Sequence, residues 1–81
     1  MKQLVFDIET DDLKATKIWC ICCIDIDSNK EYMFTPDTLS EGYKLLQSAD
    51  KLIGHNIIGF DIPVIEQIAG VSLWDKKIVD T

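Results

Sequence analysis

The first segment of the chain is rich in apolar and β-forming residues, and this pattern predicts a strand. Residues 2–8 form a short apolar run in which Leu4, Phe6 and Ile8 share one face. Side chains of a strand point alternately to its two faces, so Val5 lies on the opposite face. Because both faces begin apolar, we expect this strand to lie in the centre of a sheet.

Further short apolar runs predict four more strands. Residues 17–26 form the longest run, and it is followed by turn-forming residues at 27–30 and a further β-forming run at 31–35. This succession indicates a β-hairpin. Residues 51–54 and 77–80 are short runs that predict one strand each.

Two segments carry apolar residues at helical intervals instead. The first helix is predicted at 38–49, where Thr38 and Glu41 have the spacing of a capping box. The second is expected to begin near Asp61 or Ile62, after a loop at 55–60. The apolar residues of the first helix are Leu39, Tyr43 and Leu46. In the second helix Ile65, Ile68 and Ala69 are apolar positions, Pro63 is expected in the first turn, and Gly70 is expected to end the helix.

The order of these elements predicts an α/β fold built on a mixed sheet, with an antiparallel three-strand meander followed by parallel strands added through two helices. Sheets of this kind carry functional residues at the carboxyl ends of their parallel strands. Asp7 and Glu9 come at the end of the first strand, and His55 and Asn56 follow the end of a later one. We therefore expect these two regions to meet.

The acidic residues include one pair with the spacing of a metal site. Asp7 and Glu9 are two positions apart on a strand, so both carboxylates point to the same side and could share a divalent cation. Asp61 is either a third member of that group or an acid that caps the second helix. Asp11 and Asp12 are interpreted as solvated loop acids, although Asp12 could lie near the site. The acids interpreted as turn or surface residues are Asp25, Asp27, Asp37, Asp50 and Asp75.

Composition narrows the classes of function. The 81 residues are enough for one small domain, and 14 acidic residues stand against 8 basic ones, for a net charge of −6. All of the basic residues are Lys, which argues against a broad basic footprint for nucleic acid. The acidic surplus leaves three readings open: a solvated surface, a basic partner, or carboxylates that hold a cation.

Cysteine usage and hydropathy concern the compartment. Cys20, Cys22 and Cys23 are an odd number crowded into one strand, which favours buried thiols over disulfides or a zinc site. The N-terminus lacks the features of a secretory signal, and no apolar run approaches the roughly 18 residues of a membrane span. We expect a cytoplasmic protein that does not contact a membrane.

Two motifs resemble those of a known enzyme superfamily. Residues 6–10 (Phe-Asp-Ile-Glu-Thr) resemble the first exonuclease motif of the DEDD superfamily of 3′-5′ exonucleases, and residues 54–61 (Gly-His-Asn-Ile-Ile-Gly-Phe-Asp) resemble the second. The likeness is nearest to the proofreading domain of bacteriophage family-A DNA polymerases, in which an Asp-Thr pair like Asp80 and Thr81 often opens the next helix. The resemblance covers nearly the whole chain.

The resemblance implies a ribonuclease-H-like fold and two-metal hydrolysis of phosphodiesters at a single-stranded 3′ end of DNA. In such sites two Mg²⁺ or Mn²⁺ ions lie about 3.5 to 4 Å apart. Asp7, Glu9 and Asp61 correspond to metal ligands. Thr10 is expected to touch the terminal nucleotide, and Asn56 and Phe60 to line the path of the strand. If the protein is encoded by a phage, its compartment is the host cytoplasm.

The family also requires a third motif, with a fourth acid and a Tyr or His, and no match to it occurs in residues 1–81. Three hypotheses follow. The chain is an incomplete exonuclease domain whose C-terminal half is missing, a non-catalytic relative that binds a basic protein, or a minimal nuclease that completes its site by pairing with a second copy or by using Asp80 or Asp12. An ordinary small fold with incidental acids is the remaining alternative. Without the fourth acid and the general base, we expect little activity from this chain alone.

Overall fold

The computed structural model describes residues 1–12 and 14–81. Within these residues, five strands, two α-helices and two short helical turns follow one another. In chain order they are β1 (Gln3–Thr10), β2 (Ile18–Asp25), β3 (Lys30–Phe34), η1 (Pro36–Thr38), α1 (Leu39–Ser48), β4 (Lys51–Gly54), η2 (Ile57–Asp61), α2 (Ile62–Ala69) and β5 (Lys77–Asp80).

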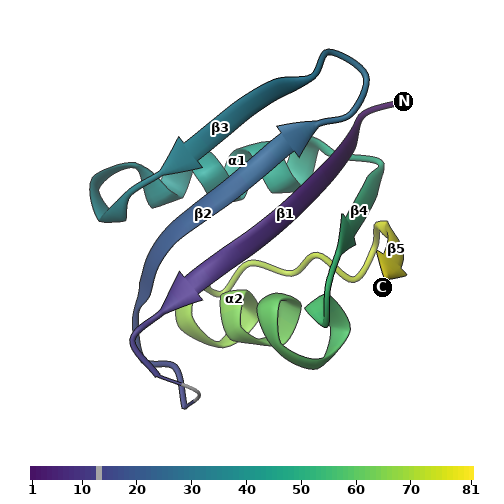
Figure 1. The fold of residues 1–81 in the computed structure, drawn as a ribbon. Coiled ribbons are helices and arrows are strands. Elements are labelled where there is room, and N and C mark those ends of the chain that lie inside the picture. The colour runs from purple at the N-terminus through teal and green to yellow at the C-terminus, as the bar shows by residue number, and fades with distance from the viewer. Residues whose placement is uncertain (13) are drawn as a thin grey trace.

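The strands form one mixed sheet in the order β3-β2-β1-β4-β5 (Figure 1). β1, β2 and β3 form an antiparallel meander, whereas β4 lies parallel to β1, and β5 lies parallel to β4. The predicted α/β fold class is therefore confirmed, and so is the central place of β1. The sheet with its two helices is compatible with a ribonuclease-H-like architecture.

The core lies between the sheet and its helices. Leu4, Phe6 and Ile8 of β1 are buried, and they share a cluster with residues of α1 and α2 such as Leu46 and Ile65. Both helices lie behind the sheet in Figure 1, so they cover the same face. This arrangement follows from the alternation in β1, which directs the three apolar side chains to that face.

In the part of the chain that the structure describes, no helix covers the opposite face of the sheet. Ile24 of β2 is 38% exposed and Met33 of β3 is 69% exposed, and Val5 lies beside them only partly buried. Asp7 and Glu9 of β1 project from this same face, because they alternate with the buried residues of the strand. The open face therefore combines apolar side chains with the acids of the first motif.

The start of α1 differs from its prediction. Thr38 is the N-cap residue, but its side chain makes no capping hydrogen bond to the helix. The capping box joins Thr35 and Thr38 around η1 instead, and the Thr35 backbone N–H donates to Thr38 Oγ1 at 2.9 Å. The capping box therefore lies one turn earlier than predicted, because Pro36 at the first position of η1 begins a helical turn before α1.

The segment between β4 and α2 is also more regular than predicted. Residues 57–61 were expected to be mostly loop, but they form η2, a single π-helical turn that leads into α2. Pro63 lies in the first turn of α2, and Gly70 ends the helix with a φ of 68°, as expected. The positive φ explains the glycine, because other residues adopt it at a cost.

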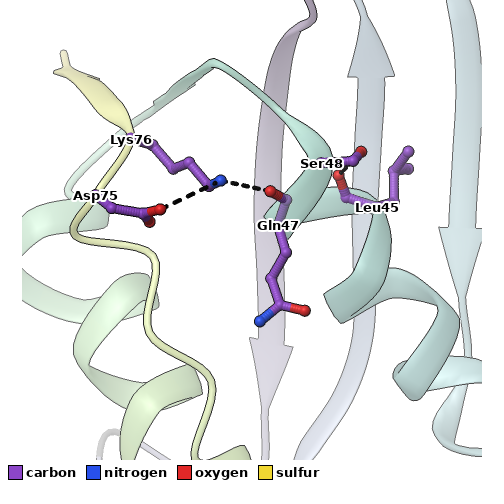
Figure 2. Close-up of polar contacts among 5 residues, drawn as sticks. All are labelled: Leu45, Gln47, Ser48, Asp75 and Lys76. Carbon is purple, nitrogen blue, oxygen red and sulfur yellow. Dashed lines mark hydrogen bonds and ion pairs between the residues drawn. The ribbon is translucent and has the colours of Figure 1, made fainter.

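The connection into β5 is tied to the end of α1, as Figure 2 shows. Lys76 Nζ donates a hydrogen bond to the backbone carbonyl oxygen of Gln47 and lies 3.6 Å from Asp75 Oδ2. In the same turn of α1, Ser48 Oγ donates to the Leu45 carbonyl oxygen at 2.6 Å. A cation near the carbonyl end of a helix is favourable, so these contacts help to hold β5 at the sheet edge.

Within residues 1–12 and 14–81, no helix is long and apolar enough to cross a membrane.

Candidate functional site

The candidate site forms where β4 ends beside β1. The parallel pairing of these strands covers only Gln3, Leu4 and Val5 of β1. Beyond that point the β4 side of β1 needs another hydrogen-bond acceptor, and Asp61 supplies it. Its Oδ2 accepts a hydrogen bond from the Ile8 backbone N–H at 3.0 Å, and the Asp61 side chain is 3% exposed. This bond brings the acid of the second motif to the strand of the first.

Asp61 therefore does not cap α2, although it occupies the N-cap position. Its backbone is already helical and its side chain makes no capping hydrogen bond. The sequence left open whether Asp61 caps the helix or joins the first-motif acids, and the geometry favours the second alternative. η2 makes this possible, because it carries the chain from the end of β4 back toward β1.

Asp7 lies close enough to Asp61 to affect the protonation of Asp61. Burial raises the pKa of Asp61 to about 6, and the nearby Asp7 carboxylate adds to that rise. The hydrogen bond from Ile8 acts in the opposite direction, since it favours the ionised form. The site thus holds two acids in contact, one of which is buried at an energetic cost.

Glu9 shares a face of β1 with Asp7 but is not gathered into the pair. Both side chains are exposed, and in the β1–β2 ladder Asp7 pairs with Cys22 and Glu9 with Cys20. Across the described part of the chain, no group of three or more His, Cys, Asp or Glu side chains is arranged to hold a metal ion. The structure therefore brings together Asp7 and Asp61, with Glu9 on the same open face.

Thr10, Asn56 and Phe60 lie around this point. The Thr10 hydroxyl donates to the Asp12 carbonyl oxygen at 2.9 Å, just beyond the end of β1. Asn56 is exposed with a left-handed φ of 54°, and its carbonyl oxygen accepts from the Phe60 N–H at 3.0 Å. Phe60 is partly buried against the core. Asn56 and Phe60 are therefore joined through the backbone of the turn that carries Asp61.

Two features of this region were missed from the sequence. The Asp80 carboxylate accepts backbone hydrogen bonds from Asn56 at 2.7 Å and Ile58 at 2.9 Å, at the start of η2. Asp11 is exposed, as expected for a solvated loop acid, and it also accepts from the Thr16 hydroxyl and from two backbone N–H groups. These bonds, with that from the Thr16 hydroxyl first, lower the pKa of Asp11 to about 2. A local signal was available for Asp11 alone, because its backbone donors lie five and six residues further along the chain, whereas Asp80 lies 22 to 24 residues from its donors.

The cysteine prediction was correct for only one residue. Cys23 is buried in the core, whereas Cys20 and Cys22 are half-buried on the open face beside the acids. Burial raises the pKa of Cys22, and the neighbouring Cys20 raises it further. The strand places alternate residues on opposite faces, so a run of three cysteines at positions 20, 22 and 23 could not be buried on one side.

A shallow apolar hollow of about 450 Å³ lies on the open face. Val5, Ile24 and Met33 supply its apolar lining, and Asp7 and Glu31 add carboxylates. The hollow is therefore apolar with two negative groups, and it adjoins the candidate site through Asp7.

Comparison with known proteins bears on the fold. No protein-family model matches the chain, and no curated protein matches it. Among solved structures, the family B DNA polymerase of the hyperthermophilic archaeon Pyrobaculum calidifontis is similar, with a TM-score of 0.67 and 20% sequence identity. The match covers 89% of this chain but 12% of that polymerase, so the chain spans a small part of its length. At this identity the likeness shows that the two share a fold.

Proposed function

We propose that this chain is an exonuclease-like domain of the kind associated with DNA polymerases, with the first and second motifs but not the third within residues 1–81. The observation that carries the proposal is the hydrogen bond from the Ile8 N–H to Asp61. Ile8 lies between Asp7 and Glu9, so the bond links the two motifs through residues that are 53 positions apart. The shared fold with a family B DNA polymerase supports the same interpretation.

Asp7, Glu9 and Asp61 offer the type of ligand that a hard divalent cation prefers. Carboxylate oxygens are the ligands that Mg²⁺ and Mn²⁺ prefer. Burial raises the pKa of Asp61 and the nearby Asp7 carboxylate raises it further, so a positive charge at this position would stabilise the ionised pair. Asp7, Glu9 and Asp61 are the residues that would hold the metal, which when bound would activate water and stabilise the leaving oxygen.

The chain's own residues would then have distinct tasks. Asp61 is fixed by the backbone of β1, whereas Asp7 and Glu9 are exposed and free to meet a ligand on the open face. Thr10 would contact the terminal nucleotide of a single-stranded 3′ end, and Asn56 and Phe60 would line its path. Residues 1–81 offer neither the fourth acid nor the Tyr or His of the third motif, so we propose that metal and DNA bind while hydrolysis is very slow.

The nearer relation to bacteriophage family-A polymerases rests on the two motifs alone. The similar solved structure is an archaeal family B polymerase. Both are DNA polymerases, so the coarser proposal does not depend on the choice, and the family-A relation stays a prediction.

Metal binding is the direct test. We would titrate Mn²⁺ into the protein and follow free Mn²⁺ by electron paramagnetic resonance, for the wild type and for the double variant Asp7→Ala, Glu9→Ala. The expected result is at least a tenfold loss of affinity in the double variant, because two of the three ligands are removed. The control Asp37→Ala, Glu41→Ala changes the net charge equally at exposed positions outside the sheet and should bind as the wild type does. Equal binding by all three proteins would contradict the proposal.

The same proteins would be incubated with a 5′-labelled single-stranded oligonucleotide and Mg²⁺ or Mn²⁺. The proposal expects binding with little or no shortening. Stepwise 3′ shortening that disappears in the Asp7→Ala, Glu9→Ala variant would contradict the inactive state proposed here and favour a minimal nuclease that completes its own site.

The hollow on the open face favours a second candidate, a non-catalytic domain that binds a basic protein. Its apolar lining and the Glu31 carboxylate suit an amphipathic helix that carries Lys or Arg. A synthetic helix of Leu and Lys would be titrated calorimetrically against wild type, Met33→Lys and Asp7→Ala. Binding that is weakened by Met33→Lys and survives Asp7→Ala would favour this candidate, and binding that is unchanged by Met33→Lys would exclude it.

A further inference from the structure

Asp80 lies at the end of β5, directly beside the last residue of β4. In the parallel ladder its register partner is Gly54. Its Oδ1 accepts the N–H of Asn56 at 2.7 Å and its Oδ2 accepts the N–H of Ile58 at 2.9 Å. The next residue, Thr81, donates its N–H to the Gly54 carbonyl oxygen at 2.9 Å. The end of β5 therefore holds the chain at the point where it leaves β4 and enters η2.

The turn held in this way has an unusual backbone. Asn56 adopts a left-handed φ of 54°, and η2 is a π-helical turn, a form that is rare in proteins. Gly59 approaches the Asn56 side chain so closely that a Cβ at Gly59 would lie 2.5 Å from Asn56 Oδ1. A conformation of this kind persists only when its surroundings fix it. The two bonds to Asp80 supply part of that constraint, because a carboxylate suits the exposed N–H groups at the start of a helical turn.

The turn ends at Asp61, whose carboxylate meets the Ile8 N–H. We propose that Asp80 is a positioning residue: by fixing the start of η2, it sets the place from which Asp61 reaches β1. The inference rests on the proposed function for its importance, since Asp61 matters there as a metal ligand. The same geometry argues against Asp80 as a replacement for the fourth acid, because both of its oxygens are used by backbone N–H groups.

Amide hydrogen exchange measured by NMR, in the presence of a chelator, tests the inference without any metal. In Asp80→Ala we expect the Ile8 amide to exchange about tenfold faster relative to the amides of β2, because the acceptor on Asp61 is no longer held in place. Asp80→Asn keeps one oxygen acceptor and should give an intermediate result. This milder variant also keeps the test informative if Asp80→Ala does not fold.

Asp25 provides a matched control. Its Oδ1 accepts the backbone N–H groups of Asp27 and Ser28 in the β2–β3 turn, a similar pair of bonds away from the site. Asp25→Asn should leave the Ile8 amide unchanged. A role in general stability alone would raise the exchange of all sheet amides together. If Asp80→Asn shifts the amides of Asn56 and Ile58 but leaves Ile8 as in the wild type, the inference is overturned.

Mn²⁺ titration of the same samples separates this inference from the proposed function. If the Ile8 amide responds to Asp80→Asn but the wild type binds no Mn²⁺, the positioning role stands and the metal site fails. If the wild type binds Mn²⁺ and Asp80→Asn alters neither the Ile8 amide nor the Mn²⁺ affinity, the positioning role fails alone.

Discussion

The Ile8 backbone N–H donates a hydrogen bond to Asp61 Oδ2 at 3.0 Å, and this bond replaces the one that β4 would supply if it continued. A buried carboxylate therefore takes the place of a backbone carbonyl at the edge of β1. The replacement introduces a group that can be protonated into the core of an 81-residue domain. Both the chemistry proposed for the site and its cost to stability come from this position.

Asp61→Asn should stabilise the protein at neutral pH. Folding raises the pKa of Asp61 from 3.8 to about 6, so the native state holds the proton more tightly than the unfolded state. The contribution of Asp61 to the free energy of unfolding is fully present below pH about 4, and it is lost as the pH rises through 6. Each pKa unit corresponds to about 1.4 kcal/mol, and Asn retains an oxygen acceptor for Ile8, so we expect a gain of about 1 to 3 kcal/mol at pH 7.5.

Urea denaturation with a chelator at pH 4.5 and pH 7.5 measures this effect. The variant should lose less stability than the wild type between the two values. Asp50→Asn serves as the control, because exposed Asp50 also accepts a backbone N–H, that of Lys2 at 2.8 Å. If the free energy of unfolding changes with pH in the same way for the wild type and for Asp61→Asn, the prediction is wrong.

Asp11→Asn should loosen the connection between β1 and β2. The contribution of Asp11 to stability has the opposite pH dependence to that of Asp61. The hydrogen bonds from Thr16 and Lys17 lower the pKa of Asp11 to about 2, so its contribution is present above pH about 4 and is lost as the pH falls toward 2. In the variant we expect faster exchange of the Thr16 and Lys17 amides at pH 6, by NMR. Asp37→Asn, at an exposed position in η1, should leave both amides unchanged.

Gly54→Ala should destabilise the fold where β4 meets β1. A Cβ at this position would lie 2.5 Å from Ile57 Cγ2 and 2.8 Å from the Phe6 carbonyl oxygen, and a backbone atom cannot easily move aside. We expect a loss of about 2 to 3 kcal/mol in the free energy of unfolding. Gly70→Asn is the control, since its Cβ meets nothing within 4 Å and Asn tolerates a φ of 68°. Similar midpoints for both variants in thermal denaturation would show that β4 adapts freely.

Met33→Lys should reduce self-association without affecting stability. Met33 is 69% exposed on the open face, so its replacement removes apolar surface and leaves the core intact. Sedimentation of the wild type should show association that increases with concentration, and the variant should remain monomeric. Ser40→Lys adds the same charge on the exposed side of α1 and should behave as the wild type does. A wild type that stays monomeric at high concentration would be evidence against self-association through the open face.

Much of the fold was predictable because its signals are local. The apolar run at residues 2–8, the hairpin after β2 and the glycine that ends α2 each act within a few residues, and each prediction is confirmed to within about two residues. The antiparallel meander and the parallel strands added after it followed from the same elements together with general rules of connection. The prediction of the capping box of α1 was wrong because Thr35 and Thr38 offer overlapping patterns, and only Pro36 indicates which of them begins the helical turn.

The candidate site was less predictable because its contacts are not local. The sequence indicated the acids at positions 7, 9 and 61, but it left open which of them meet and could not reveal the π-helical turn that carries Asp61. It also gave no sign that Asp80, 22 to 24 residues downstream, binds the start of that turn. Such bonds depend on the register between β4 and β5, which no periodicity within one segment encodes.

The pairing of β1 with two differently connected neighbours has a consequence for the order of folding. β2 and β3 follow β1 through short connections, so the meander requires little loop closure and can form early. The Ile8 amide must wait for a partner 53 residues further along the chain. Contacts of such separation form slowly, so we expect the meander to appear first and the two acidic motifs to meet only in the final, rate-limiting step.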